Sequence, residues 1–139
     1  MKKNFWLIKS EPSTWSWNDQ LKNKIDMWDG VRNYQARNNL MKMKNGDHCF
    51  FYHSVKEKSI VGIVEVVKEH YPDPTDKTGR FVVVDVKALE TLKKPVTLDE
   101  IKKNKKLASI KLIKQSRLSV MPISNIEFKE IIKLSSKNE

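Results

Sequence analysis

The amino-acid sequence predicts an α+β fold in which about five to six strands form a curved, barrel-like mixed sheet surrounded by short helices. Runs rich in β-branched and aromatic residues recur along the chain, and capping signals for short helices lie between them. Turn residues join several of these runs directly, which favours hairpins over a strict alternation of strand and helix. The chain has 139 residues, the usual size of one domain, so we expect a single domain over residues 1–139.

The N-terminal region predicts a strand followed by a short helix. The run NFWLIKS at residues 4–10 is apolar and rich in strand formers, and it ends at the turn signal EPS. Ser16 is a good N-cap, and Asp19 follows it by three residues, the spacing of a capping box. The helix is therefore expected to begin directly after Ser16.

A second helix is predicted over residues 34–44. Gly30 indicates a turn before it, and Asn33 is a favourable N-cap. Leu40 and Met43 fall on its inward face, and the Asn-Gly pair that follows stops the helix.

Three neighbouring strands are predicted in the middle of the chain, over residues 48–54, 59–71 and 81–92. The turn-rich stretch PDPTDKTG separates the second strand from the third. Gly62 stands in the second strand at a position where a side chain is expected, which indicates the close approach of a backbone or a ligand.

The C-terminal part predicts two more helices and one more strand. Pro95 is expected to end the sheet, and Thr97 with Glu100 forms a capping box for a short helix. Residues 117–123 predict a strand that closes with a proline, and a last helix begins at Ser124. The inward face of this helix is expected to carry Ile126, Ile131 and Leu134.

Charge is the strongest global feature, because 27 Lys and Arg against 17 Asp and Glu give a net charge of +10. The excess is concentrated in residues 101–126, the basic segment, which contains seven Lys and Arg and no acidic residue. Clustered cations attract phosphate by releasing counterions, so we expect a nucleic-acid partner and phosphate contacts from Lys105 and Lys106. The alternative is that these lysines only solvate the surface.

The sequence shows neither a membrane-spanning stretch nor an export signal, so we expect a soluble intracellular protein, cytoplasmic or, in a eukaryote, nuclear. Cys49 is the single cysteine and lies in an apolar run, where a buried thiol is expected. His48, His53 and His70 have no cysteine or paired carboxylate at ligand spacing, so no metal is expected. We also expect no cofactor and a monomer; the sequence names no effector protein.

The segment WDGVRNYQARNN, residues 28–39, has almost no aliphatic side chain to pack. Trp28 can stack on a base taken out of its stack, and the amides of Asn33 and Gln35 can pair with a base edge. Two arginines can bind flanking phosphates, Arg32 and Arg37. The segment therefore predicts one edge of a ligand pocket.

Stretches from one end of the chain to the other resemble the EVE domain family. They are, in order, WLIKSEP, WDGVRNYQARNNL, GDHCFFYHS, IVGIVEVV, YPDPT, VDV, PVTL and RLSVMPI. The resemblance implies a PUA-like fold, a pseudo-barrel related to the PUA, ASCH and YTH domains, and a non-catalytic role in recognising a modified base of DNA or RNA.

The same resemblance implies the position of the pocket. The KS pair after the first strand and the following tryptophan are similar to those of YTH readers, which places Lys9, Ser10 and Trp28 in an aromatic-lined site. In relatives the second aromatic wall lies in an insertion that is shortened here. Phe81 is the aromatic residue that remains in it, so it is the expected second wall. Arg117 and Ser119 belong to a stretch that resembles the family's C-terminal pocket element.

Further residues are expected at the pocket mouth or in the core. Tyr52, His53 and Ser54 end a strand where it meets a loop, and Tyr34 is expected to be half buried as a hydrogen-bond anchor. Trp6 and Phe50 are expected to pack inward, whereas Trp15 and Trp17 are left unassigned.

Two alternative functions remain open. An RNA-processing enzyme of ASCH-like type would use Lys9, Glu11 and His53 as an acid–base set. A plain PUA-type RNA-binding module would read shape without an extruded base, so that Lys105 and Lys106 would matter more than Trp28.

Overall fold

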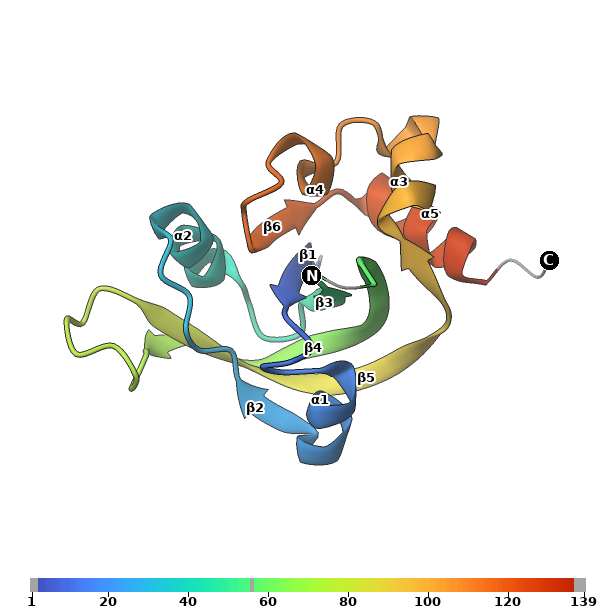
Figure 1. The fold of residues 1–139 in the computed structure, drawn as a ribbon. Coiled ribbons are helices and arrows are strands. Elements are labelled where there is room, and N and C mark those ends of the chain that lie inside the picture. Colours follow the sequence, from blue (N-terminus) through green and yellow to red (C-terminus); the bar gives the residue numbers. More distant parts are fainter. Residues whose placement is uncertain (1–2, 56, 137–139) are drawn as a thin grey trace.

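The computed structural model describes residues 3–55 and 57–136. One mixed sheet of six strands has the order β2-β5-β4-β3-β1-β6 (Figure 1). The strands are β1 (Phe5–Ser10), β2 (Ile25–Met27), β3 (His48–His53), β4 (Ser59–Pro72), β5 (Val82–Thr97) and β6 (Val120–Ile123). β1 runs parallel to β3, and all other neighbouring strands pair antiparallel. The predicted α+β class and mixed sheet are confirmed.

Short helices surround the sheet, as predicted. They are α1 (Trp17–Asn23), α2 (Tyr34–Lys42), α3 (Leu98–Lys103), α4 (Lys111–Lys114), α5 (Asn125–Ser135) and the 3-10 helix η1 (Lys105–Leu107). Figure 1 shows α3, α4 and α5 grouped on one side, α1 and β2 on the opposite side, and α2 beside the loop that joins β4 to β5. Among the described residues, no helix has the length and apolarity needed to cross a membrane.

The local start signals of the helices are confirmed. The Ser16 hydroxyl accepts the Asp19 amide and the Asp19 carboxylate accepts the Ser16 amide, which is the reciprocal pattern of a capping box. The boxes expected at Thr97 and Ser124 are present too. The Asn33 side chain accepts the Ala36 amide at the start of α2.

Two expectations about the elements were wrong, and three short elements were not predicted. Pro95 does not end the sheet, because β5 bulges between its pairings with Gly62 and Ile60 and a proline there needs no ladder hydrogen bond. Ile126 is 70% exposed, since it lies in the first turn of α5, whereas Ile131 and Leu134 are buried. β2, η1 and α4 were not predicted: each has three or four residues, too few to show a period.

Large apolar side chains form the core on both faces of the sheet, because successive residues of β1 and β3 are buried. Trp6 and Phe50 pack inward as predicted. Phe51 also lies in this core, where the ring of Trp28 meets it edge-on at a centroid distance of 5.5 Å. Figure 1 shows β4 and β5 sweeping along the molecule as one long curved ribbon pair that carries this core.

Gly62 allows the indole of Trp17 to lie directly on β4. A Cβ at position 62 would overlap the six-membered ring of Trp17, and the Trp17 Nε1 donates to the Thr91 hydroxyl on β5 at 2.9 Å. Gly62 therefore does permit a close approach, but the group that approaches is a core side chain. A larger residue at position 62 is therefore expected to act first on the packing of the core.

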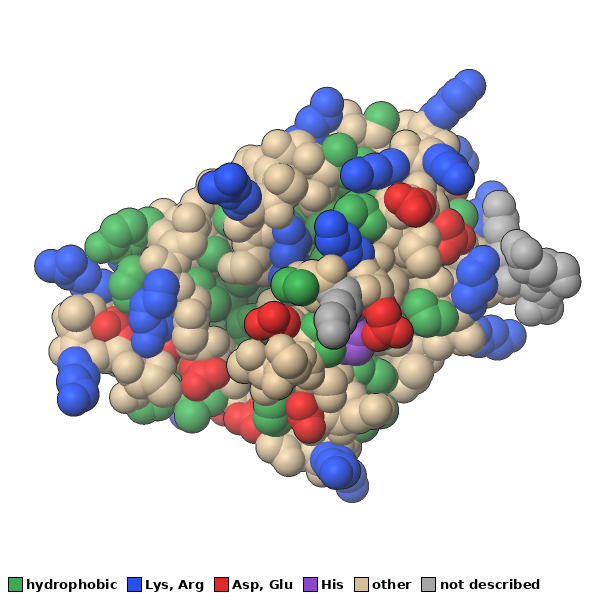
Figure 2. Space-filling model, viewed as in Figure 1, with side chains coloured by type: hydrophobic (Ala, Val, Ile, Leu, Met, Phe, Trp, Pro, Cys, Tyr) green, Lys and Arg blue, Asp and Glu red, His purple; other side chains and the backbone are tan. Residues whose placement is uncertain are grey.

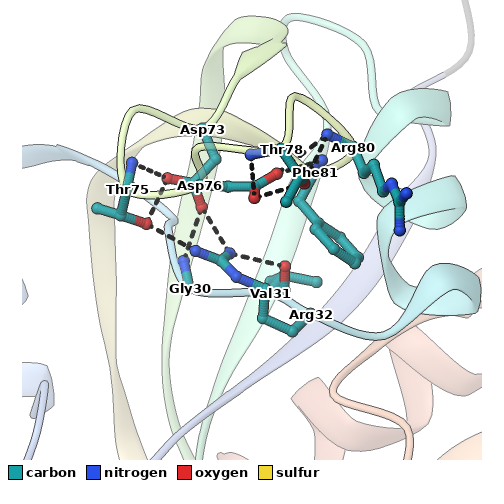
Figure 3. A network of polar contacts seen from close by, with 9 residues as sticks. All are labelled: Gly30, Val31, Arg32, Asp73, Thr75, Asp76, Thr78, Arg80 and Phe81. Atoms are coloured by element: carbon teal, nitrogen blue, oxygen red, sulfur yellow. Dashed lines mark hydrogen bonds and ion pairs between the residues drawn. The ribbon is translucent and has the colours of Figure 1, made fainter.

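The lip, defined as residues 28–33, is tied to the β4–β5 loop by the carboxylate of Asp73 (Figure 3). One oxygen of this buried carboxylate accepts the Gly30 amide and the Arg32 guanidinium, each at 3.0 Å. The other oxygen accepts the amide of Thr75 at 2.7 Å and its hydroxyl at 2.6 Å. Burial alone would raise the pKa of Asp73, but these hydrogen bonds outweigh it and lower the pKa.

The second half of the same loop is closed by Asp76. Its carboxylate accepts the hydroxyl and amide of Thr78 and the amides of Arg80 and Phe81, at distances from 2.7 to 3.0 Å. The hydrogen bonds from Thr78 and from these amides lower the pKa of Asp76 to about 2. Two aspartates thus give a fixed shape to a loop that has few apolar side chains (Figure 3).

Gly62→Ala should destabilise the protein, because the added methyl group forces the Trp17 ring to move in a packed core. We expect a loss of roughly 1–3 kcal/mol in the free energy of unfolding, measured by urea denaturation. Trp17→Phe removes part of the obstructing ring, so the double variant should lose less than the sum of the single variants. Additive losses would show that the two positions do not interact.

Asp73→Asn should loosen the lip, because an amide offers one acceptor oxygen where the carboxylate offers two. We expect a loss of roughly 1–3 kcal/mol at pH 7, with Asp99→Asn as an exposed control that changes little. Because its pKa is lowered, the Asp73 carboxylate stabilises the fold at pH values above 3.8, the ordinary pKa of aspartate. This stabilisation is lost as the pH falls through the lower pKa of the folded state. The difference between wild type and Asp73→Asn should therefore shrink in acid, and a difference that is constant from pH 7 to pH 2 would contradict this account.

Candidate functional site

The main cavity lies between the end of β1, the turn before α1 and the lip, and it has a volume of about 830 Å³. Six predicted site residues line it: Lys9, Ser10, Trp28, Arg32, Asn33 and Ser119. Glu11, which belongs to the same turn as Lys9 and Ser10 and was considered above for acid–base chemistry, lines it too. Lining residues that were not predicted individually are Thr14, Trp15, Asp26, Met27, Asp29, Gly30 and Val31. Figure 2 shows hydrophobic side chains at the bottom of a hollow in this face.

Two tryptophans line the main cavity. Trp28 is only 8% exposed, and its backbone amide donates to the carbonyl of Val84 on β5 at 2.8 Å. Trp15 is half-buried, and its Nε1 donates to the Gln20 side chain at 3.0 Å. The hydroxyl of Ser10 donates to the Trp15 carbonyl, so the end of β1 holds the turn that carries Trp15.

Lys9 crosses from β1 to the C-terminal part of the chain. Its Nζ donates to the Ser116 carbonyl at 2.7 Å and lies 5.9 Å from the centre of the Tyr52 ring. Its backbone amide donates to the Ser119 carbonyl at 2.9 Å. Burial lowers the pKa of the Lys9 ammonium from its ordinary value, because the charged form loses water.

The remaining polar groups of the cavity differ in how many hydrogen bonds they already make within the protein. Arg32 is bound to Asp73 and to the Thr75 hydroxyl, and Asn33 uses its side-chain oxygen to cap α2. Asp26 accepts from Asn23 and from the Met27 amide. Asp29 is exposed, and no described residue donates a hydrogen bond to its carboxylate. Asp29 is therefore an available acceptor at the rim.

A smaller groove of about 290 Å³ adjoins the main cavity and shares Asn33 with it. Gln35 and Arg117, both predicted site residues, line this groove instead of the main cavity, together with Gln115, Ser116 and Leu118. The Gln35 Nε2 donates to the Gln115 Oε1 at 2.8 Å. Gln35 and Trp28 therefore line different spaces, because the first turn of α2 borders the groove and not the main cavity.

The residues expected at the pocket mouth on β3 do not line the main cavity. Tyr52 is buried, and burial raises its pKa to about 12. His53 accepts the backbone amide of Trp17 through its Nε2 at 3.0 Å, and burial lowers its pKa, so the neutral ring satisfies the start of α1. Ser54 donates its amide to the Ser10 carbonyl at 2.9 Å. Tyr52 and His53 are therefore engaged within the fold, and Ser54 contributes a backbone hydrogen bond.

Phe81, the expected second aromatic wall, does not line the main cavity. It is buried beside the lip and stacks on Tyr34, with ring centres 5.2 Å apart and planes 25° apart. The guanidinium of Arg32 lies 5.4 Å from the Phe81 ring, and that of Arg37 lies 4.8 Å from the Tyr34 ring. The four side chains form a stacked column beside the main cavity, and of the four only Arg32 also lines that cavity.

Tyr34 is half-buried as expected, at 50% exposure, but no described residue hydrogen-bonds its hydroxyl. Arg37 is held by the Arg80 carbonyl at 3.2 Å and by the Asn38 side chain at 2.8 and 3.1 Å. Both residues therefore present flat faces on the surface of the stacked column.

The two lysines predicted to contact phosphates, Lys105 and Lys106, do not line the main cavity, although Ser119 of the same basic segment does. Lys105 and Lys106 belong to η1 and are exposed, and the Nζ of Lys106 lies 3.7 Å from a carboxylate oxygen of Glu130. Figure 2 shows Lys and Arg side chains spread around this face with acidic side chains between them. In the part of the chain that the structure describes, no group of three or more His, Cys, Asp or Glu is placed to hold a metal ion.

The missed lining residues gave little local signal. Trp15 directly precedes the N-cap Ser16. The sequence therefore placed Trp15 in a turn but did not indicate where its side chain points. Asp26 and Met27 lie in β2, which was not predicted. Asp29 gave the one available signal, because it directly follows Trp28, a residue already expected in the pocket.

Comparison with known proteins agrees with the resemblance found in the sequence. Mouse thymocyte nuclear protein 1 is 36% identical over 94% of this chain and 73% of that protein. The structure of Rpa0253 from Rhodopseudomonas palustris is 47% identical with a TM-score of 0.91, covering 98% of this chain and 95% of that one. The human THYN1 protein, solved in complex with DNA containing 5-methylcytosine, is 34% identical with a TM-score of 0.89, covering 99% of this chain and 100% of that one.

The family model of the EVE domain matches residues 4–134, which is nearly the whole chain. The resemblance that the sequence stretches carried is thereby confirmed. This chain belongs to the EVE domain family.

Proposed function

We propose that this protein binds DNA that carries a modified base and holds that base in the main cavity. The observation that carries the proposal is the pair of tryptophans, Trp15 and Trp28, lining one cavity of about 830 Å³. The relative solved with 5-methylcytosine DNA supports the class of ligand, because it aligns with this chain over its whole length. A base of a duplex reaches such a cavity by leaving the stack.

Stacking on aromatic faces is the physical reason for this proposal. Taking a base out of the duplex costs a few kcal/mol, and each aromatic face returns roughly 1–3 kcal/mol. Trp15 is half-buried and offers more of its surface, whereas Trp28 is held in place by Phe51 and the Val84 carbonyl. Trp28 would act as the fixed wall and Trp15 as the face opposed to it.

The polar groups at the rim suit a cytosine-like base. The amino group at N4 of cytosine is a donor, and aspartate is a suitable acceptor for it. Asp29 is exposed and free to accept, as described above. The nearby Lys9 ammonium and the Asn33 amide can donate to ring nitrogen and carbonyl oxygen. We infer that the base is read by Asp29, Lys9 and Asn33, with Ser10 and Ser119 completing the wall.

A binding role agrees better with the geometry than a catalytic one. The acid–base set of Lys9, Glu11 and His53 would need the three groups in one cavity. His53 does not line the main cavity, and its Nε2 is engaged by the Trp17 amide. The site is therefore proposed as a reader.

Electrostatic attraction would come from outside the cavity. Arg37 lies next to the lip, and Lys105 and Lys106 are exposed in the basic segment. We propose that these cations contact phosphates. Such contacts position the strand without reading its sequence or its modification.

Trp15→Ala and Trp28→Ala should each weaken binding to a duplex with one 5-methylcytosine by about tenfold to a hundredfold, since each removes a stacking face worth roughly 1–3 kcal/mol. Fluorescence anisotropy with methylated and unmethylated duplexes measures the affinity and the preference. Tyr34→Ala is the matched control, because it removes an exposed aromatic ring outside the cavity.

Trp28 packs in the core, so circular dichroism must show that its variant is folded, and Trp15→Ala tests the cavity at a less buried position. The proposal fails if both folded variants keep the wild-type preference for the methylated duplex.

Replacing Lys105 and Lys106 together by alanine should make binding less sensitive to salt. Each lost phosphate contact lowers the slope of log affinity against log salt concentration by about one unit. Lys22→Ala with Lys87→Ala removes the same charge from exposed positions on α1 and β5 and serves as the control. An equal change of slope in both double variants would mean that net charge, not these two contacts, attracts the DNA.

A further inference from the structure

The smaller groove beside the main cavity has no role in holding the modified base. It is bounded by the first turn of α2 on one side and by residues 115–118 on the other. Asn33 belongs to the walls of both spaces, and Lys9 in the main cavity donates to Ser116 in the groove. If one nucleotide is held in the main cavity, the nucleotide adjacent to it in the strand would therefore lie at the groove.

Two glutamine side chains from distant parts of the sequence meet across this groove. The Gln35 Nε2 donates to the Gln115 Oε1 at 2.8 Å, although 80 positions separate the residues in the chain. Both amides are accessible, so water could satisfy them separately; the hydrogen bond instead gives them one common orientation. The pair keeps an acceptor in the Gln35 Oε1 and donors in the Gln115 Nε2.

An accessible donor next to an accessible acceptor matches the edge of a base. Glutamine amides pair with the N6 and N7 groups of adenine, and arginine pairs with the O6 and N7 groups of guanine. Arg117 lines the same groove, is exposed and makes no ion pair with any described residue. A phosphate would be held by donors alone, so an amide pair with a free acceptor is better suited to a base.

We propose that this groove binds the base adjacent to the modified one and reads its edge through the Gln35–Gln115 pair and Arg117, with a preference for a purine. This inference rests on the proposed function, because it requires a modified base in the neighbouring cavity. It adds a preference for sequence context to the recognition of the modification. Gln35, Gln115 and Arg117 are the specificity-determining residues of this subsite.

The test measures the affinity for sixteen duplexes that share a central 5-methylcytosine and differ in the bases on its two sides. Wild-type protein should bind the best and worst contexts with affinities that differ by about fivefold to a hundredfold, as expected for one well-read base. Purines should be favoured at one flanking position. Fluorescence anisotropy at a single salt concentration makes the sixteen values comparable.

The variants are Gln35→Ala, Gln115→Ala and the double variant. Both single changes break the same hydrogen bond, so each should reduce the spread among contexts, and the double variant should reduce it further, to the part that Arg117 supports. The preference for methylated over unmethylated DNA should persist in all three. Asn18→Ala is the matched control, because Asn18 occupies the second position of α1 as Gln35 does in α2, and it lines neither space.

The outcomes separate this inference from the function on which it rests. A wild-type protein that prefers methylated DNA equally in all sixteen contexts overturns the inference and leaves the proposed function intact. A double variant that keeps the wild-type ranking of contexts overturns it as well. A wild-type protein that does not distinguish methylated from unmethylated DNA in any context overturns both.

Discussion

The antiparallel pairing of β4 with β5 is the interaction on which the other parts of the molecule depend. These two strands, of 14 and 16 residues, are the longest in the sheet, and each carries a shorter neighbour, β3 on β4 and β2 on β5. The loop between them supplies Asp73, which binds the lip, and Gly62 and Thr91 on their faces position Trp17. The cavity is thus assembled from segments that have little regular structure of their own but are attached to one rigid pair.

The structure separates two kinds of aromatic surface near the lip that the sequence does not distinguish. Trp15 and Trp28 line a cavity, whereas Tyr34 and Phe81 stack on each other and between two guanidinium groups outside it. The difference arises from the β4–β5 loop. Asp76 binds the amides of Arg80 and Phe81, which fixes the direction in which the Phe81 ring leaves the loop. Whether an aromatic side chain near the cavity lines it therefore depends on the conformation of the backbone that carries the side chain, and the residue type alone does not determine it.

Most of the fold could be predicted because its signals are local. The caps at Ser16, Asn33, Thr97 and Ser124 act within one helical turn, and the long apolar runs identified the strands. β2 escaped prediction because its three residues are held by pairing with β5, a partner about sixty positions away. For the site, the Lys9–Ser10 turn and Trp28 followed from the family resemblance and do line the cavity. The structure places Trp15, and not Phe81, in the lining of the cavity, and it places Gln35 in a separate groove. Both placements depend on tertiary contacts that one sequence does not reveal.

The tether between Asp73 and the lip has a consequence for the kinetics of recognition. Gly30 and Arg32 are bound to this carboxylate within the fold itself, so the conformational entropy of ordering the lip is lost during folding and, under the proposed function, not at each encounter with DNA. Association then requires no closure of this loop, and the arrival rate of correct and incorrect bases should differ little. Discrimination would lie in residence time: a base that fills the cavity poorly leaves sooner, while the rim that admitted it stays unchanged.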